Sequence, residues 1–226
     1  MFRAASDSVR WIASFFAPQT LVRRSSTHHA HLEVVQLRGR KVLDGATVNY
    51  SFGGLHEVFA EVFERLDVRR RDVKSALVLG LGAGSVVHLL RRDCAISAPI
   101  TAIEIDAAVI ELGKLHFGLG AWRDLEIVHA DACAWIEKST RRFDLVVVDV
   151  FDEARIPDAL KTPEFLARLH AAIAPGGLLV FNQVSSRPEV RLESHRFAAQ
   201  CAAVFAGSRT LEVGGNLVIV FEAPRV

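Results

Sequence analysis

The sequence predicts an α/β fold, in which a doubly wound, mostly parallel sheet of seven strands with an antiparallel last strand follows a small N-terminal β-meander. Three observations predict it. From residue 74 onward, apolar segments of strand length alternate with segments of helical spacing, and parallel strands need such crossover connections. A glycine-rich turn follows the first of these strands. The last two strands are separated only by Gly214, Gly215 and Asn216, a link that forces an antiparallel pair.

Composition excludes several classes of protein. Half of the 226 residues are apolar, which is enough for a sizeable core. The 27 basic and 26 acidic residues nearly balance, so no basic surface for a nucleic-acid partner is expected. The three cysteines have no metal-ligand spacing, which predicts no metal site and a reducing, cytoplasmic location. No apolar run reaches the roughly 20 residues of a membrane-spanning helix.

Residues 1–30 form the first expected segment, an N-terminal extension or helix that is rich in Arg and Ser and contains one acid, Asp7. Its apolar side chains at helical spacing are Trp11, Ile12, Phe15 and Phe16. This stripe favours a helix that packs against the rest of the protein. An organellar transit peptide and a membrane-surface helix are the alternatives.

Residues 31–73 form the second expected segment, a small β-meander followed by a helix. Apolar and polar residues alternate over 31–51, and turn signals interrupt the alternation at Arg38-Gly39 and Asp44-Gly45. Helical spacing follows over 55–66.

The third expected segment, 74–226, contains the remaining elements. Strands are predicted at 76–81, 100–105, 125–129, 144–149, 178–183, 209–213 and 217–222. Helices are predicted at 85–92, 107–117, 132–138, 163–173 and 188–205.

A nucleotide-binding motif lies at the start of this segment. Gly80, Gly82 and Gly84 follow the first strand, where glycines let the backbone turn sharply and approach a ligand closely. Glu104 ends the next strand, about twenty residues past the turn, where a carboxylate can accept hydrogen bonds from both ribose hydroxyls. The alternative for Glu104 is a surface carboxylate at a strand end. Nucleotide binding by 74–226 is therefore the first functional prediction.

Four further segments make the chain resemble the polyamine aminopropyltransferases, the spermidine synthase family, within the Rossmann-like class I S-adenosylmethionine-dependent methyltransferase fold. They are Leu43-Asp44-Gly45, Leu55-His56-Glu57, Ile103-Glu104-Ile105-Asp106, and Phe143-Asp144 running through Val148-Asp149-Val150-Phe151-Asp152 and Pro157 to Thr162-Pro163-Glu164-Phe165. The resemblance implies a transferase that uses S-adenosylmethionine or its decarboxylated form as donor, without a metal.

The resemblance also implies roles for individual residues. It assigns cofactor binding to Gly80, Gly82, Gly84, Glu104, Asp131 and Ala132, and catalysis to Asp149 and Asp152. In this assignment, Asp131 and the Ala132 N–H contact the adenine, Asp149 handles the attacking amine, and Asp152 holds the acceptor. Asp131 has an alternative role as the N-cap of the helix that follows it. Asp149 and Asp152 have alternative roles as turn or surface carboxylates.

Four more residues are candidate substrate contacts. His56 could reach the ligand if the loop after the meander closes over the site, and its alternative is a structural role. Tyr50, in the same segment, could stack on the site or simply pack. Asn182 and Gln183 end a predicted strand and could line the acceptor pocket or make strand-end hydrogen bonds.

The preferred function is transfer of an aminopropyl or methyl group to a small nucleophile, such as the amine of a polyamine, as in polyamine biosynthesis, by a protein that forms a homodimer. Four positions depart from the family pattern: Val48, Leu55, Ala83 and Lys161. Since three of them normally face the donor's tail or the acceptor, a methyltransferase without polyamine activity is the alternative. A nicotinamide-dependent oxidoreductase would need a glycine where Ser85 stands. A non-catalytic nucleotide-binding module is the remaining alternative.

Overall fold

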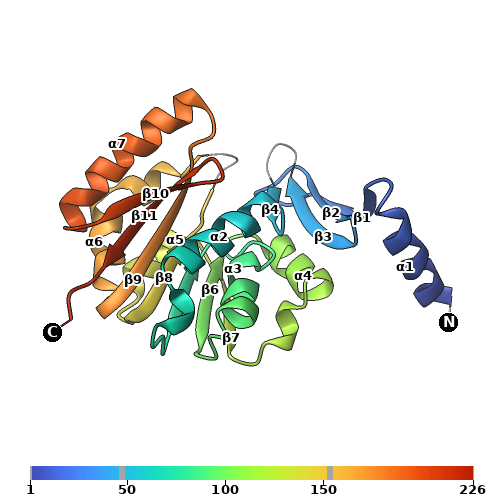
Figure 1. Cartoon of the computed structure of the whole chain (residues 1–226), viewed down its shortest axis with the longest axis horizontal. Coiled ribbons are helices and arrows are strands. Elements are labelled where there is room, and N and C mark those ends of the chain that lie inside the picture. Colours follow the sequence, from blue (N-terminus) through green and yellow to red (C-terminus); the bar gives the residue numbers. More distant parts are fainter. Residues whose placement is uncertain (1, 46–48, 152–154, 226) are drawn as a thin grey trace.

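The computed structural model describes residues 2–45, 49–151 and 155–225, with the backbone alone for 2–7 and 49–51. The N-terminal region holds one helix and an antiparallel sheet of four strands in the order β1-β2-β3-β4. Its elements are α1 (Phe2–Ala13), β1 (Gln19–Arg24), β2 (Leu32–Leu37), β3 (Arg40–Gly45) and β4 (Asn49–Ser51). Helix α1 and this sheet occupy the end of the molecule opposite to the C-terminus (Figure 1).

Strand β1 is an addition to the predicted meander. It lies within 1–30, where the sequence predicts only an extension or a helix, and it pairs with β2 from Gln19 to Arg24. The segment escapes prediction because Leu21 and Val22 are adjacent and are its only apolar side chains, so it lacks the alternation of a half-buried strand. The division of the chain at residues 30 and 73 stays a prediction.

The seven-strand sheet of the second region confirms the predicted fold class. Its strands are β5 (Ala76–Leu79), β6 (Ile100–Glu104), β7 (Leu125–His129), β8 (Phe143–Val148), β9 (Ile173–Val184), β10 (Arg209–Val213) and β11 (Asn216–Glu222). Their order is β10-β11-β9-β8-β5-β6-β7. The pairs among β5 to β9 are parallel, whereas β11 runs antiparallel to both β9 and β10. The Gly214-Gly215 link has positive φ at both residues, as so tight a hairpin requires.

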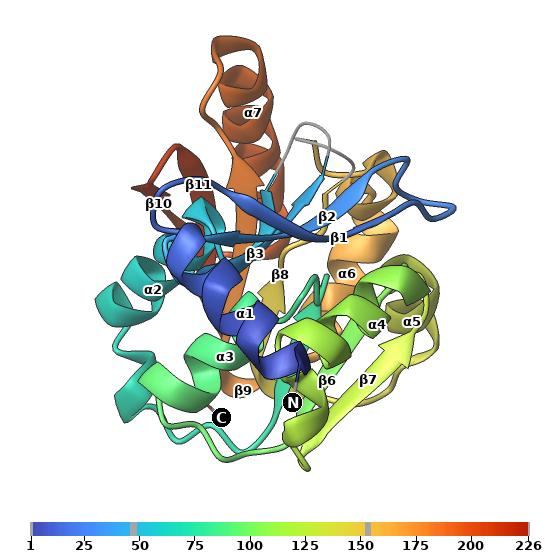
Figure 2. The same cartoon turned by 90° about the vertical axis from the view of Figure 1, so that its right-hand side faces the viewer.

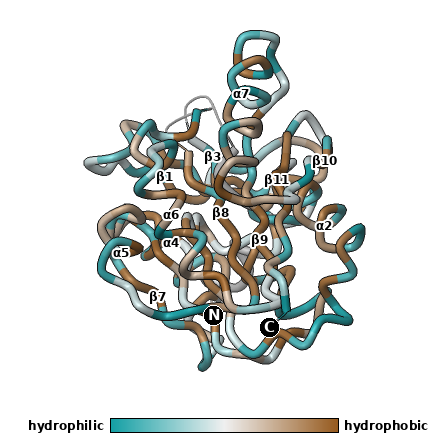
Figure 3. The backbone as a smooth tube through the Cα atoms, turned by 90° about the vertical axis from the view of Figure 1, so that its left-hand side faces the viewer, coloured by the Kyte–Doolittle hydropathy of each residue, from teal (hydrophilic) through white to brown (hydrophobic). Residues whose placement is uncertain are grey.

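Helices cover both faces of this sheet, and the hydrophobic strands run between them (Figure 3). The α-helices of this region are α2 (Gly54–Arg65), α3 (Ser85–His88), α4 (Ala107–His116), α5 (Ala132–Lys138), α6 (Pro163–Ala171) and α7 (Pro188–Val204). Short 3-10 helices lie at Val68–Arg70, Leu119–Ala121 and Asp158–Lys161, and a π-helical turn at Leu89–Asp93 replaces the end of the predicted helix 85–92. One core cluster joins the sheet to α2 and α3, and another joins it to α5, α6 and α7.

A third apolar cluster attaches the N-terminal sheet to the second region. Leu32, Val34 and Leu43 of β2 and β3 pack against Val109 and Leu112 of α4. Figure 2 shows β1, β2 and β3 crossing the molecule beside α4. This packing brings the loop between β1 and β2 to the carboxyl end of β6.

The order of the parallel strands determines where a ligand site can form. The chain proceeds from β5 to β6 and β7 on one side, then returns to place β8 on the other side of β5. In open α/β sheets, ligands bind at such a switch point, outside the carboxyl ends of the strands. The loops after β5 and β8 meet there.

Candidate nucleotide-binding site

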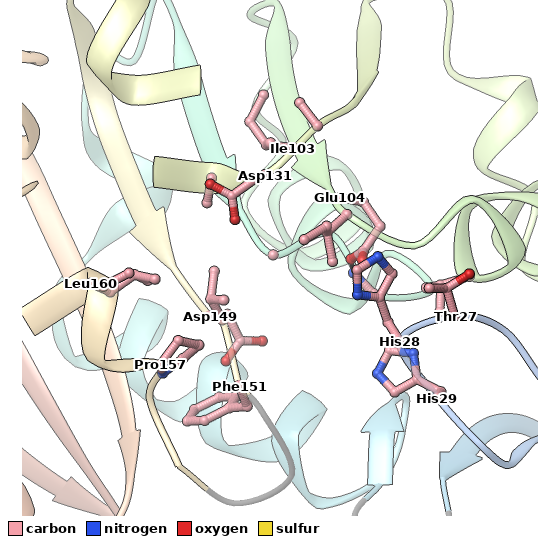
Figure 4. A pocket seen from close by; sticks show the side chains of 18 of the residues that line it. Thr27, His28, His29, Ile103, Glu104, Asp131, Asp149, Phe151, Pro157 and Leu160 are labelled. Atoms are coloured by element: carbon pink, nitrogen blue, oxygen red, sulfur yellow. Dashed lines mark hydrogen bonds between the residues drawn. The ribbon is translucent and has the colours of Figure 1, made fainter. Parts of the chain in front are cut away.

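A cavity of about 440 Å³ lies at this switch point, within the usual size range of small-molecule sites. Six of the predicted site residues line it: Gly80, Gly82, Glu104, Asp131, Ala132 and Asp149. These residues lie at or just after the carboxyl ends of four strands, β5, β6, β7 and β8. In Figure 4, Glu104, Asp131 and Asp149 surround one open space.

Glu104 at the end of β6 is held by two backbone N–H groups. Its Oε2 accepts a hydrogen bond from Gly82 N at 2.9 Å, and its Oε1 accepts one from Asp106 N at 3.0 Å. Only 9% of the residue is exposed, and this burial raises its pKa although the two hydrogen bonds oppose the shift. Each carboxylate oxygen keeps a second acceptor site, so Glu104 can still receive two hydroxyl donors.

Two of the predicted glycines form the floor of the cavity. Gly80 has a φ of +86°, and a Cβ there would lie 2.2 Å from the Asp149 carbonyl oxygen. A side chain at this position would therefore separate the end of β5 from the end of β8. Gly82 also has a positive φ and donates its N–H to Glu104.

Gly84 has a different role from the one predicted by resemblance. It lies outside the residues that line the cavity, and a Cβ there would meet Leu119 Cδ2 at 2.3 Å. Its φ is +100°. Gly84 thus permits close packing behind the turn, which is the third glycine's role in dinucleotide-binding turns.

Asp131 is the N-cap of α5 and also lines the cavity, so its position is compatible with both roles that the sequence leaves open. It is exposed to the cavity, and its Oδ1 accepts a hydrogen bond from Ala134 N at 2.8 Å, which makes it the N-cap of α5. One carboxylate oxygen is thereby used for capping and the other is available to a ligand. Ala132, the first residue of the helix, is 7% exposed and lines the cavity beside it.

Asp149, directly after β8, is oriented by two buried asparagines. Asn182 Nδ2 donates a hydrogen bond to Asp149 Oδ1 at 2.9 Å. Asn216 Nδ2 in turn donates to Asn182 Oδ1 at 2.9 Å, which fixes which way the Asn182 amide points. Asn182 is completely buried, so it lies behind Asp149 rather than in the wall of the cavity. We call these three residues the Asp149 relay.

The environment of Asp149 suits proton transfer near neutral pH. Its side chain faces the cavity but has protein atoms on every other side, and this burial raises its pKa to about 7. The hydrogen bond from Asn182 opposes the shift, and repulsion from Glu104 adds to it. A carboxyl group with such a pKa is present in both protonation states at physiological pH, as a general base requires.

Sequence reasoning missed the contribution of the loop between β1 and β2. Thr27, His28 and His29 line the cavity, and Figure 4 shows the two histidines closing one side of it. His29 Nδ1 contacts Asp106 Oδ2 at 2.6 Å, and the Ser26 hydroxyl donates to the same oxygen. The sequence signal that could have found it is β1 itself. If 19–24 had been predicted as a strand, residues 25–31 would have been identified as the polar loop that joins it to β2.

Asp106 holds this loop in place while it caps α4. Its Oδ1 accepts a hydrogen bond from Ala108 N at 2.8 Å. Burial alone would raise the pKa of Asp106, but the hydrogen bonds from Ser26, His29 and Ala108 outweigh it and leave the pKa below its ordinary value. Asp106 therefore stays ionised and can hold a protonated His29 as an ion pair.

Two of the predicted substrate contacts, His56 and Gln183, lie away from this cavity. His56 lines a separate cavity of about 410 Å³ beside α2, stacks on Phe52, and has a buried Nδ1 without a hydrogen-bond partner among the described residues. Gln183 points to the opposite face of the sheet from Asn182, toward α7. The backbone of Tyr50 belongs to β4, and Asp152 lies outside the described residues.

Of the four positions that depart from the family pattern, Leu55 makes part of the cavity wall apolar. Leu55 lines the cavity together with Pro157 and Leu160. Ala83 is completely buried in the cluster between the N-terminal sheet and α4. Val48 lies outside the described residues, and the Lys161 ammonium group pairs with Asp158 and Glu193. Within the described part of the chain, no three His, Cys, Asp or Glu side chains are grouped to hold a metal ion.

Comparison with protein families and curated proteins gives a consistent picture. The model of the spermine/spermidine synthase domain matches residues 55–213. A probable polyamine aminopropyl transferase of Bifidobacterium longum is 24% identical over 205 residues, which cover 87% of this chain and 45% of that protein. An eEF1A lysine and N-terminal methyltransferase homolog of Drosophila melanogaster is 26% identical over 180 residues, or 73% of this chain and 26% of that protein. The chain thus spans less than half the length of these two relatives.

Solved structures share the fold. Spermidine synthase from Thermotoga maritima matches with a TM-score of 0.70 at 16% identity, over 90% of this chain and 72% of that chain. Human methyltransferase-like protein 13 in complex with SAH matches with a TM-score of 0.62 at 20% identity, over 76% of this chain and 83% of that chain. These matches confirm the predicted class I methyltransferase fold.

Proposed function

The chain belongs to the spermine/spermidine synthase family, and from this premise we propose that it is a transferase that moves a carbon group from an S-adenosyl sulfonium donor to a small nucleophile such as an amine. The observation that carries the proposal is one cavity that joins Glu104 and the glycine floor to Asp149. The family uses S-adenosylmethionine or its decarboxylated form as donor. A nucleoside and a reacting nucleophile would therefore share this cavity.

The adenosine half of the donor would bind along β5, β6 and β7. Glu104 has two free acceptor sites for the ribose hydroxyls, and Gly80 and Gly82 leave room beneath the ribose because they have no side chains. Asp131 could accept a hydrogen bond from the adenine amino group through the oxygen that does not cap α5. The sulfonium would then lie over the switch point, near Asp149.

At the reacting end, Asp149 would prepare the nucleophile. An amine with a pKa of about 10 arrives protonated, and the Asp149 carboxylate removes its proton. The nitrogen lone pair then forms a bond to the carbon next to sulfur while the carbon–sulfur bond breaks, and the electron pair of that bond stays on sulfur. The sulfonium is already activated, so the protein's main contribution is alignment of the two reactants. Asp152, which lies outside the described residues, is proposed to hold the far end of the acceptor.

Methyl transfer from S-adenosylmethionine is a second candidate, favoured by a specific observation. The family's acid in the glycine turn is replaced by Ala83, which is completely buried, so the cation of an aminopropyl tail has no carboxylate there. The apolar lining at Leu55, Pro157 and Leu160 points the same way. One sequence relative is a methyltransferase homolog, which supports this second candidate.

Calorimetric titration with S-adenosylmethionine, its decarboxylated form and NAD tests the proposal. We expect heat with at least one sulfonium nucleoside and none with NAD. Glu104→Gln should weaken the binding by about tenfold or more, because a charged hydrogen bond contributes roughly 1.5–3 kcal/mol. The matched control Glu164→Gln, on the exposed start of α6, should bind like the wild type. Binding of NAD alone would overturn the proposal, and the preferred sulfonium nucleoside distinguishes aminopropyl from methyl transfer.

A further inference from the structure

The most exposed apolar surface of the described residues lies on α1 and the turn that follows it. Val9, Trp11, Ile12, Phe15 and Phe16 are all exposed, Phe16 to 88%. We call these five side chains the α1 patch. Trp11 and Phe15 lie against the turn at Gly39, yet about half of each side chain stays exposed, and Val9, Ile12 and Phe16 are more exposed still. Several exposed apolar side chains that lie next to one another on a protein surface indicate an interaction site.

The α1 patch is part of the folded structure. Ser14 is buried, and its hydroxyl oxygen donates to Trp11 O at 2.6 Å and accepts from Gly39 N at 2.9 Å. The Ser14 carbonyl accepts a further hydrogen bond from Arg38 N at 2.8 Å. The rings of Trp11 and Phe15 pack edge to face over the turn between β2 and β3. The N-terminal sheet therefore presents the patch in a fixed orientation.

The surroundings of the patch are strongly cationic. Residues 1–45 contain seven Lys or Arg residues and three acids, Asp7, Glu33 and Asp44, whereas the whole chain has a net charge of only +1. Glu33 is occupied by Arg23 and His31. Three arginines are exposed and form no ion pair with another described side chain: Arg10 on the helix itself, Arg38 in the turn bonded to Ser14, and Arg40 at the start of β3. The patch thus has aromatic groups at its centre and unneutralised cations at its edge.

This distribution of charge decides which occupant fits. In a symmetric dimer the same surface of both copies would meet, which would gather Arg10, Arg38 and Arg40 of both copies in one interface with no acid of the patch to neutralise them. Anionic phospholipid headgroups, in contrast, would neutralise these cations while the aromatic and aliphatic side chains enter the boundary of the acyl chains. Figure 1 shows α1 at one extremity of the molecule and Figure 2 looks onto that end, so a flat surface can approach it.

We propose that the α1 patch and its basic rim bind the surface of an anionic phospholipid bilayer. The binding is peripheral, since none of the described helices is long and apolar enough to cross a membrane. It would place the transferase fold beside the bilayer, attached through its N-terminal sheet. The proposal concerns a surface remote from Glu104 and Asp149 and does not depend on the proposed function.

Co-sedimentation of the full chain with vesicles tests the proposal. We expect binding to vesicles of equal parts phosphatidylcholine and phosphatidylglycerol, little binding to phosphatidylcholine alone, and loss of binding in high salt because salt screens exposed charges. Phe16→Ser should weaken the partition into mixed vesicles by about tenfold or more. Arg10→Gln and Arg40→Gln should each weaken it about fivefold.

Matched variants separate the patch from general surface effects. Leu192→Ser removes an exposed apolar side chain from α7, and Arg142→Gln removes an exposed cation far from α1. Both should bind vesicles like the wild type, and circular dichroism should show that every variant is folded. Absence of wild-type binding to mixed vesicles in low salt would overturn the proposal. Dissociation of a dimer by Phe16→Ser in sedimentation velocity, without vesicle binding, would also overturn it and assign the patch to a second copy.

Discussion

Two carboxylates face the same cavity but are held in different ways. Glu104, on the β6 side, receives hydrogen bonds from the backbone N–H groups of Gly82 and Asp106. Asp149, on the β8 side, receives one from the side chain of Asn182, which is itself oriented by Asn216. The fold alone therefore positions Glu104, whereas Asp149 depends on two replaceable side chains. Backbone N–H groups suit the binding role proposed for Glu104, whereas the proton transfer proposed for Asp149 can be tuned by the side chains around it.

The largest expected effect comes from the glycine that joins the two sides. Gly80→Ala would put a Cβ 2.2 Å from the Asp149 carbonyl oxygen at a φ of +86°. We expect the free energy of unfolding to fall by about 3 kcal/mol or more, from backbone strain and steric overlap together. Urea denaturation measures this change. Gly120→Ala is the control, because a Cβ there meets no atom within 4 Å. A loss below about 1 kcal/mol would show that the strands can separate without cost.

Removal of the Asp149 charge should separate catalysis from binding. Asp149→Asn should lower turnover by about a hundredfold or more, since it abolishes the proton acceptor. Nucleoside affinity should stay within a few-fold of the wild type, because Glu104 is untouched. Single-turnover kinetics and calorimetry measure the two quantities. Turnover close to the wild type would contradict the assignment of Asp149 as proton acceptor.

The raised pKa of Asp149 also predicts a pH dependence of stability. Between the unfolded value of 3.8 and the folded value of about 7, the native state binds more protons than the unfolded state, so stability should decrease as pH rises through this range. Asp149→Asn removes the free-energy cost of ionising this buried carboxyl group. The variant should therefore have a Tm a few degrees above the wild type at pH 8 and an equal Tm near pH 4. An unchanged difference at both pH values would mean that the pKa of Asp149 is not raised.

Turnover should rise over the pH range in which the free energy of unfolding falls, because both depend on ionisation of Asp149. The unprotonated carboxylate is the acceptor, so turnover should increase through a pH of about 7 and then level off. A pH–rate profile of the wild type measures this. Deprotonation of an exposed acid would instead produce a midpoint near 4, which would rule out Asp149 as the titrating group.

The smallest effect is expected from the far end of the Asp149 relay. Asn216→Ala removes the donor that orients the Asn182 amide, and turnover should fall by roughly fivefold, in line with about 1 kcal/mol for one hydrogen bond. The midpoint of the pH–rate profile should move upward, because Asn182 no longer reliably stabilises the carboxylate. Asn216→Asp should be worse than Asn216→Ala, since its carboxylate opposes the Asn182 oxygen. A loss of stability with an unchanged pH profile would assign Asn216 a purely structural role.

The comparison between the two carboxylates also shows how far sequence reasoning could reach. Glu104 and its glycines were predictable because a strand, a sharp turn and a second strand are local features, each visible within a few residues. Asp149 was predictable for the same reason, at the end of an apolar strand. Gly84 fits the same pattern, but its role in packing depends on Leu119, more than thirty residues further along the chain.

The Asp149 relay was not predictable as a unit. Asn182 and Gln183 are adjacent in the sequence and look equivalent, but a strand points them to opposite faces, and only one face meets Asp149. The choice depends on the register of β9 against β8, and Asn216 joins through the register of β11 against β9. The loop between β1 and β2, which carries His28 and His29, likewise reaches the cavity only because β2 and β3 pack on α4.

By itself, then, the sequence determined the alternation of strands and helices and the glycine turn, because periodicity and turn chemistry act between near neighbours. Its family followed from the resemblance of particular segments to known sequences. Only the tertiary structure decided which polar groups surround Asp149, which loop closes the cavity and which apolar side chains of α1 stay exposed. These features depend on pairings between distant segments. Many registers and packings are compatible with the same local pattern, and the free energy of the whole fold selects one of them.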